Sequence, residues 1–143
     1  MKLKHIVPAG LALGACTLLP AFATTQEQSL EASERREARI VLRLHQLVYG
    51  MPELCAGQAD AEAVRAAATK FQHAYPELVP LLEDSPHAAT ARARTQEMLD
   101  DTVGQARTQP LAECGASATM LEEFVSGTEG QAQIREALDE LRR

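Results

Sequence analysis

The sequence predicts an all-α fold, a small antiparallel bundle of four main helices with one disulfide, Cys55–Cys114. Three observations support this prediction. Apolar residues recur at steps of three and four through most of the chain, as on the buried face of a helix. No stretch alternates apolar and polar residues with many β-branched side chains, as a strand would. The two cysteines each follow a short proline-containing break and precede a glycine.

The first 23 residues have the three parts of a bacterial signal peptide. The basic start contains Lys2 and Lys4, a mainly apolar segment covers residues 6–19, and Ala21-Phe22-Ala23 is a small-x-small cleavage site. The apolar segment is too short to span a membrane. We expect cleavage after Ala23, which leaves a single helical domain over residues 24–143 in the periplasm or outside the cell.

A second interpretation of the leader places a lipid anchor on Cys16. The segment that ends at this cysteine, Leu13-Gly14-Ala15-Cys16, resembles a lipobox. The residues after it, 17–22, remain mostly apolar, whereas a lipoprotein usually turns polar where the chain leaves the bilayer. Cleavage after Ala23 is therefore the favoured interpretation, and the two differ in the mature N-terminus.

The first two helices are predicted from periodicity and from their end signals. The first covers residues 29–49, and Gly50 is its expected stop. The second covers residues 60–75, with Asp60 as the N-cap. Pro76 ends it because a proline disfavours helical geometry in the residue before it.

The last two helices have weaker boundaries. The third is predicted from Ser85, an N-cap residue followed by proline, to about Thr108. The fourth begins near Ser117 and is either continuous or broken between Gly127 and Gly130. An apolar turn, with or without one short helix, joins the second helix to the third.

The helix order places the two cysteines together. Short connections make successive helices antiparallel neighbours, so the end of the first helix and the end of the third lie at the same end of the bundle. A disulfide needs this proximity. Closing a loop of this length removes about 4 kcal/mol of conformational freedom from the unfolded chain in the entropy model.

The remaining motifs exclude several kinds of chemistry. The chain has no C-x-x-C or C-x-x-C-H for redox or haem sites, and no G-x-S-x-G, P-loop or H-E-x-x-H. The histidines of the mature chain, His45, His73 and His87, fall on different helices and are not expected to converge on a metal. We therefore expect no catalytic residues, no metal and no cofactor.

The charge of the mature chain argues against nucleic acid as a partner. Loss of Lys2 and Lys4 leaves 12 basic and 20 acidic residues, a net charge of −8. A protein with this balance needs a local basic patch before it binds nucleic acid or anionic lipid.

Two features are candidate partner-binding surfaces. Basic residues fall at four-residue steps on the first helix, where they are either a solvated face or a recognition stripe for carboxylates. The apolar turn over residues 78–82 is either a hydrophobic patch for a partner or, as we prefer, a plug in the core. The residues are Arg35, Arg39 and Arg43 in the stripe and Leu78, Val79, Leu81 and Leu82 in the turn.

These observations predict a small exported protein that acts by binding another protein, of the inhibitor, immunity or assembly-factor type, without catalysis of its own. One alternative is a small helical enzyme or ligand-binding bundle of the chorismate mutase class. Such an enzyme needs several cations converging inside the bundle, whereas Lys70 is the only lysine after residue 23. Another alternative is a structural lipoprotein subunit at the outer membrane.

Overall fold

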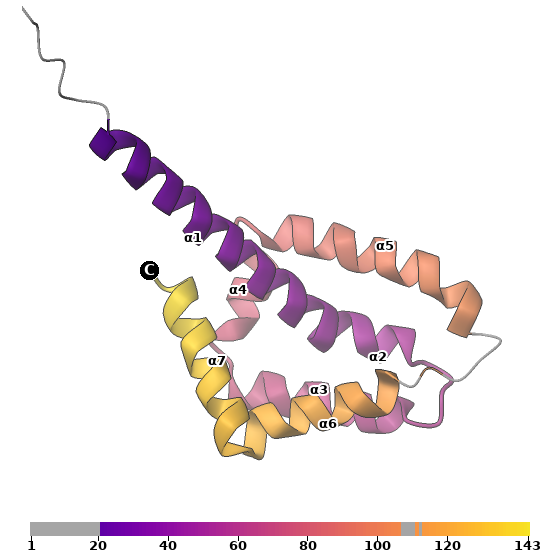
Figure 1. Ribbon diagram of the computed structural model, residues 1–143. Helices are drawn as coiled ribbons and strands as arrows, with labels where there is room; N and C mark the ends of the chain where they lie inside the picture. The colour runs from indigo at the N-terminus through magenta and orange to yellow at the C-terminus, as the bar shows by residue number, and fades with distance from the viewer. Residues whose placement is uncertain (1–20, 107–110, 112) are drawn as a thin grey trace, which may run out of the picture.

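The computed structural model describes residues 21–106, 111 and 113–143 of the chain. Most of the predicted signal peptide, together with Cys16, lies outside the described residues. Every regular element in the described ranges is a helix, as the sequence predicts (Figure 1). None of the helices within these ranges is long and apolar enough to cross a membrane.

The first predicted helix is longer than the sequence suggests. Helix α1 (Ala21–His45) continues through a π-helical turn, η1 (Gln46–Gly50), into α2 (Met51–Leu54). The predicted stop at Gly50 is therefore wrong. The N–H of Met51 donates to the carbonyl of Gln46, five residues back. This wide turn places Pro52 in the first turn of α2, where the missing N–H of a proline is tolerated.

The second predicted helix is confirmed within one residue at each end. Helix α3 (Ala61–Ala74) has Asp60 at the N-cap position, although its side chain forms no capping hydrogen bond. The chain leaves the helix at Tyr75, as Pro76 requires. The apolar turn that follows forms a short helix, α4 (Leu78–Asp84).

The later boundaries differ more from the prediction. Helix α5 (Ala88–Ala106) begins three residues after Ser85, whose buried hydroxyl has no hydrogen-bond partner in the described structure. The predicted end near Thr108 lies outside the described residues. The last segment forms two helices, α6 (Glu113–Ser126) and α7 (Thr128–Leu141), so it starts four residues earlier than predicted and breaks at Gly127.

The helices associate in two pairs. Helix α5 runs beside α1 in the same direction, and α6 runs beside α3 (Figure 1). Helix α7 folds back across the end of the molecule where α6 stops. This turn depends on Gly130, because a Cβ at that position would lie 2.3 Å from the backbone oxygen of Glu123.

Two clusters of buried residues hold the pairs together. The larger cluster centres on Val41, Phe71 and Leu121, which come from α1, α3 and α6. The smaller one surrounds the Cys55–Cys114 disulfide, whose Cα atoms are 5.8 Å apart. The disulfide joins the end of α2 to the start of α6 and confirms the predicted pairing.

Candidate functional site

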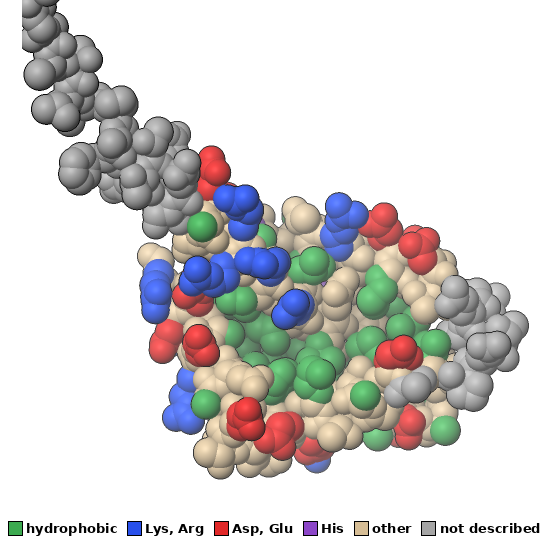
Figure 2. All heavy atoms as spheres, in the orientation of Figure 1, with side chains coloured by type: hydrophobic (Ala, Val, Ile, Leu, Met, Phe, Trp, Pro, Cys, Tyr) green, Lys and Arg blue, Asp and Glu red, His purple; other side chains and the backbone are tan. Residues whose placement is uncertain are grey.

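An open groove between α1 and α6 is the candidate functional site, and we call it the α1–α6 groove. It has a volume of about 620 Å³. Figure 2 shows a broad hollow of hydrophobic side chains in this part of the surface. The lining residues come from α1, η1, α2, α5, α6 and α7, and most are apolar: Ile40, Arg43, Leu44, Gln46, Leu47, Met51, Met98, Glu113, Ser117, Met120, Phe124, Gln133, Ile134 and Ala137.

The groove exists because α6 has two faces at helical spacing. Cys114, Ala118 and Leu121 recur at steps of four and three and are buried. Met120 and Phe124, four residues apart, line the groove instead. Helix α6 packs extensively against α3, and α1 against α5. The α1–α6 side is therefore left open.

Methionine is prominent in the lining of the groove. Met51, Met98 and Met120 come from three different helices. Met120 is 49% exposed, and it is the one exposed large hydrophobic side chain among the described residues. Methionine side chains are flexible and polarizable, so they adapt to the shape of a bound apolar surface.

The α1 edge of the groove is basic. Arg43 lines the groove, and Arg35 and Arg39 continue the row along the exposed face of α1. Figure 2 shows a group of basic side chains above the hydrophobic area, with acidic side chains mainly around its lower border and at the edges of the view. Arg35 is 72% exposed and lies 3.6 Å from a carboxylate oxygen of Glu31, a pair that contributes little to stability.

Both ends of the groove are tied across. At one end the Cys55–Cys114 disulfide joins α2, which continues α1, to the start of α6. At the other end Arg36 of α1 donates to Glu140 of α7 at 3.0 Å. The Glu140 side chain is only 11% exposed and also lies 3.4 Å from Arg143. The disulfide therefore links the two walls of the groove covalently, whereas the Arg36–Glu140 pair links α1 to α7 beside the groove.

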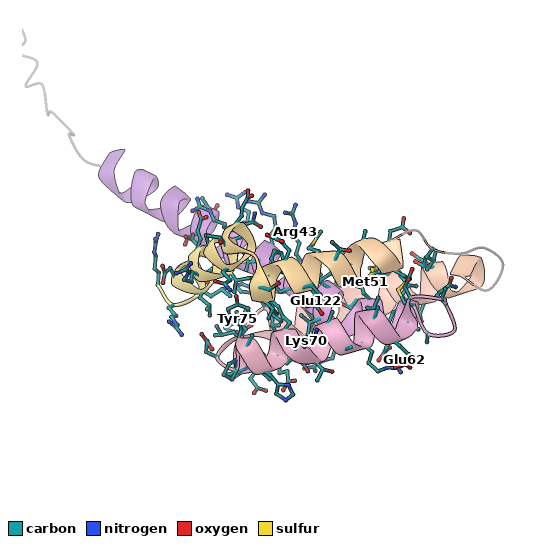
Figure 3. The ribbon with its side chains drawn as sticks, turned by 90° about the horizontal axis from the view of Figure 1, so that it is seen from below. Arg43, Met51, Glu62, Lys70, Tyr75 and Glu122 are labelled. Atoms are coloured by element: carbon teal, nitrogen blue, oxygen red, sulfur yellow. A yellow bond between two sulfur atoms is a disulfide. The ribbon has the colours of Figure 1, made fainter. Side chains whose placement is uncertain are left out.

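The opposite side of α6 is occupied by α3. Figure 3 shows Lys70 and Glu122 on this side, and Arg43 and Met51 on the groove side. The Lys70 ammonium lies 2.6 Å from Glu122. The Tyr75 hydroxyl donates to the carbonyl of Phe124. Burial raises the pKa of Tyr75, which keeps this donor protonated. The lysine that the enzyme alternative would use is therefore paired outside the groove.

The four residues predicted as a patch in the apolar turn differ in how far they are buried. Leu78 and Leu82 are each 1% exposed and belong to the core, so no partner reaches them. Val79 and Leu81 are half-buried, and Leu81 packs against the same core. We therefore leave the turn out of the candidate site. The structure brings only Arg43 of the predicted residues into the α1–α6 groove.

A second, more polar cleft separates α1 from the start of α5. Its volume is about 580 Å³, and its lining includes Arg35, Arg39, Arg94 and His87. Glu31 and Glu34 lie in the same cleft and offset part of its positive charge. Arg94 also pairs with Glu97 at 2.8 Å.

The three histidines are in different surroundings. His45 is buried in the α1–α5 contact, His87 lies 3.9 Å from Glu37, and His73 is exposed. Desolvation and the nearby Arg92 guanidinium lower the pKa of His45, against an opposing effect of Glu83. In the part of the chain that the structure describes, no three His, Cys, Asp or Glu residues form a group that could hold a metal ion.

Sequence reasoning did not find the groove. Periodicity identified Met120 and Phe124 as apolar residues of the last helix, but it could not show that they remain accessible. The chain matches no protein-family model, no curated protein and no solved structure.

Proposed function

We propose that this chain is an exported protein that binds another protein in the α1–α6 groove and has no catalytic activity of its own. The role would be that of an inhibitor, an immunity protein or an assembly factor, with the four main helical segments arranged as an antiparallel bundle. The observation that carries the proposal is the groove itself, which is mostly apolar, open and lined at its α1 edge by Arg43. Such accessible apolar areas mark interaction sites in proteins.

The shape of the groove favours a protein over a small molecule. Small-molecule sites enclose most of the ligand surface, whereas this groove lies open along the side of the molecule. Its adaptable methionines and its arginine rim are typical of protein interfaces, which are enriched in both residues.

The disulfide supports the proposed location. Disulfides persist in oxidising compartments such as the bacterial periplasm. We propose that residues 1–23 direct export and are then removed, with a lipid anchor at Cys16 as the less favoured alternative.

Site-specific photo-cross-linking in the producing cells tests the proposal. A photoreactive residue at position 120 should give a discrete protein adduct, because this position lies in the groove. The same residue at position 66, exposed on α3, is the matched control. Alanine replacement of Arg35, Arg39 and Arg43 should remove the adduct without lowering the melting temperature. Equal adducts at both positions, or none at position 120, would contradict the proposal.

The polar α1–α5 cleft supports a second candidate function, the binding of a small anionic ligand. Three arginines line it, and Arg39 among them forms no ion pair with a carboxylate of the described residues, so it is free to bind an anion. A rise in melting temperature with a dicarboxylate, lost in Arg39→Gln, would favour this candidate.

A further inference from the structure

We infer that the occupant of the α1–α6 groove is an amphipathic α-helix of a partner protein that carries acidic residues along the flank facing α1. This inference rests on the proposed function and names the chemistry of its partner. The length of the groove, the arginines on α1 and the polar sequence of the N-terminal arm support it.

The dimensions of the groove suit a helix. Its α6 wall extends from Glu113 to Phe124, which at 1.5 Å per residue is about 16 Å, or three helical turns. A helix of that length presents apolar residues at steps of three and four to such a groove. The methionines can adjust to the side chains that a particular partner helix presents.

The charges on the rim specify one flank of that helix. Arg35, Arg39 and Arg43 follow one another at four-residue steps, about 6 Å apart along α1. A partner helix lying alongside would place carboxylates at the same spacing when they occur every four residues. Arginine suits this role because its guanidinium binds a carboxylate through two parallel hydrogen bonds.

Two of these arginines are available for a partner. Within the described part of the chain, neither Arg39 nor Arg43 forms an ion pair with a carboxylate. Arg39 donates only to the backbone carbonyl of Arg35. Among the described residues that line the groove, the exposed Glu113 at the start of α6 is the one acidic residue. The groove therefore favours an acidic flank over a basic one.

A second copy of this chain supplies no suitable helix from its N-terminal arm. The start of α1 projects beyond the other helices (Figure 1). Between residues 24 and 37 this arm has Leu30 as its only large apolar residue. It lacks the apolar stripe that the groove would bury, so we assign the groove to a different protein.

Two designed peptides test this inference. Both are fluorescein-labelled 18-residue amphipathic helices with the same leucine stripe, and one flank carries either Glu or Lys every four residues. We expect the mature protein to bind the Glu peptide about tenfold more tightly than the Lys peptide in fluorescence anisotropy, since Arg39 and Arg43 can each form an ion pair with the first peptide and with none of the lysines of the second. Equal affinities, a preference for Lys, or no binding of either peptide would overturn the inference.

Matched variants locate the effect. Reversing Arg35, Arg39 and Arg43 to Glu should invert the preference. Reversing Arg65, Arg135 and Arg142 changes the net charge equally on other surfaces and should leave the preference intact. Met120→Ala should weaken the binding of both peptides. A stable dimer in sedimentation that the Glu peptide fails to displace would assign the groove to a second copy instead.

The peptide experiment tests this inference and the cross-linking experiment tests the proposed function, so their negative results can be told apart. If position 120 gives a protein adduct but the peptides show no acidic preference, the proposed function stands and this inference is wrong. If the Glu peptide binds but no protein adduct forms at position 120, the groove can bind a helix, whereas the proposed function, binding a partner protein in the producing cells, is contradicted.

Discussion

At the scale of single residues, His45 links the core to the α1–α5 contact. Its side chain is 7% exposed, and its Nδ1 lies 2.9 Å from the Thr95 hydroxyl oxygen. That hydroxyl donates its own proton to the carbonyl of Ala91, so it accepts from His45. The neutral imidazole therefore carries its proton on Nδ1, and a second proton would have to bind at Nε2.

This arrangement predicts a stability that falls in mild acid. The pKa of His45 is lowered in the folded state from its usual 6.5, so the unfolded chain binds more protons below that pH. Well above pH 6.5, His45 is neutral in both states and the free energy of unfolding has its full value. It decreases as the pH falls below 6.5, toward the pKa of His45 in the folded state. Chemical denaturation between pH 7.5 and 5.5 should show this loss, and His45→Gln should reduce it.

The variant is informative because glutamine stays neutral and can still donate to Thr95. The exposed His73 provides the control, since His73→Gln should leave the pH dependence as it is in the unmodified protein. The assignment of this effect to His45 would be contradicted if both variants kept the same loss.

At the scale of elements, the π-helical turn is where local signals and packing disagree. Gly50 and Pro52 each favour the end of a helix, yet the chain continues to Leu54. A Cβ at Gly50 would lie 2.8 Å from Cγ2 of Thr95 and 3.0 Å from Cε of Met98. The glycine therefore serves the close contact of η1 with α5, and it does not end the helix.

Gly50→Ala should consequently destabilise the protein. The Thr95 side chain cannot rotate to move its methyl group away, because its hydroxyl group is hydrogen-bonded to the His45 ring and to the carbonyl of Ala91. We expect a net loss of about 1–2 kcal/mol in urea unfolding, since overpacking outweighs the better helix propensity of alanine. In a Thr95→Ser background, which removes only the methyl group, the same substitution should cost much less.

The double-mutant cycle isolates this contact from the general effect of the substitution. Gly115→Ala is a useful comparison, because its Cβ would meet only the flexible carboxylate of Asp60, at 3.3 Å. An equal cost of Gly50→Ala in both backgrounds would mean that Thr95 is not what restricts position 50.

The other elements show what the sequence can determine. Apolar periodicity predicted the main helical segments, because one face of each is buried, but it left α2 and the first turn of α6 in the predicted breaks around the cysteines and left α4 undecided between a turn and a short helix. The start signal at Ser85 failed, and the start predicted near Ser117 lies four residues too late. Neither residue begins a helix, because capping preferences of about 1 kcal/mol are smaller than the packing energies that set these boundaries.

At the scale of the whole molecule, the candidate site depends on how far apart two helices lie. The arginine stripe was visible in the sequence, whereas the groove beside it was not. Met51, Met98 and Phe124 come from distant parts of the chain, and each has the periodicity of an ordinary core residue. Only the pairing of α1 with α5 and of α6 with α3 leaves Met98 and Phe124 partly accessible, whereas Met51 lines the groove as a core residue that is 8% exposed.

The disulfide joins stability to this geometry. It closes a separation of 59 residues, which corresponds to about 4 kcal/mol in the entropy model, a large share of the stability of a small domain. Replacing Cys55 and Cys114 with alanine should therefore lower the free energy of unfolding by several kcal/mol. A melting temperature unaffected by the replacement or by reductant would contradict this expectation.

The same replacement should also weaken the proposed interaction, because the disulfide ties the continuation of α1 to the start of α6 at one end of the groove. At a temperature where the variant remains folded by circular dichroism, the covalent link between the two walls is absent and only packing holds α6 in place. We expect the variant to bind the Glu peptide more weakly and to discriminate less against the Lys peptide. If the folded variant keeps the full affinity and preference, the packing of α6 on α3 is sufficient to shape the groove, and the disulfide contributes stability only.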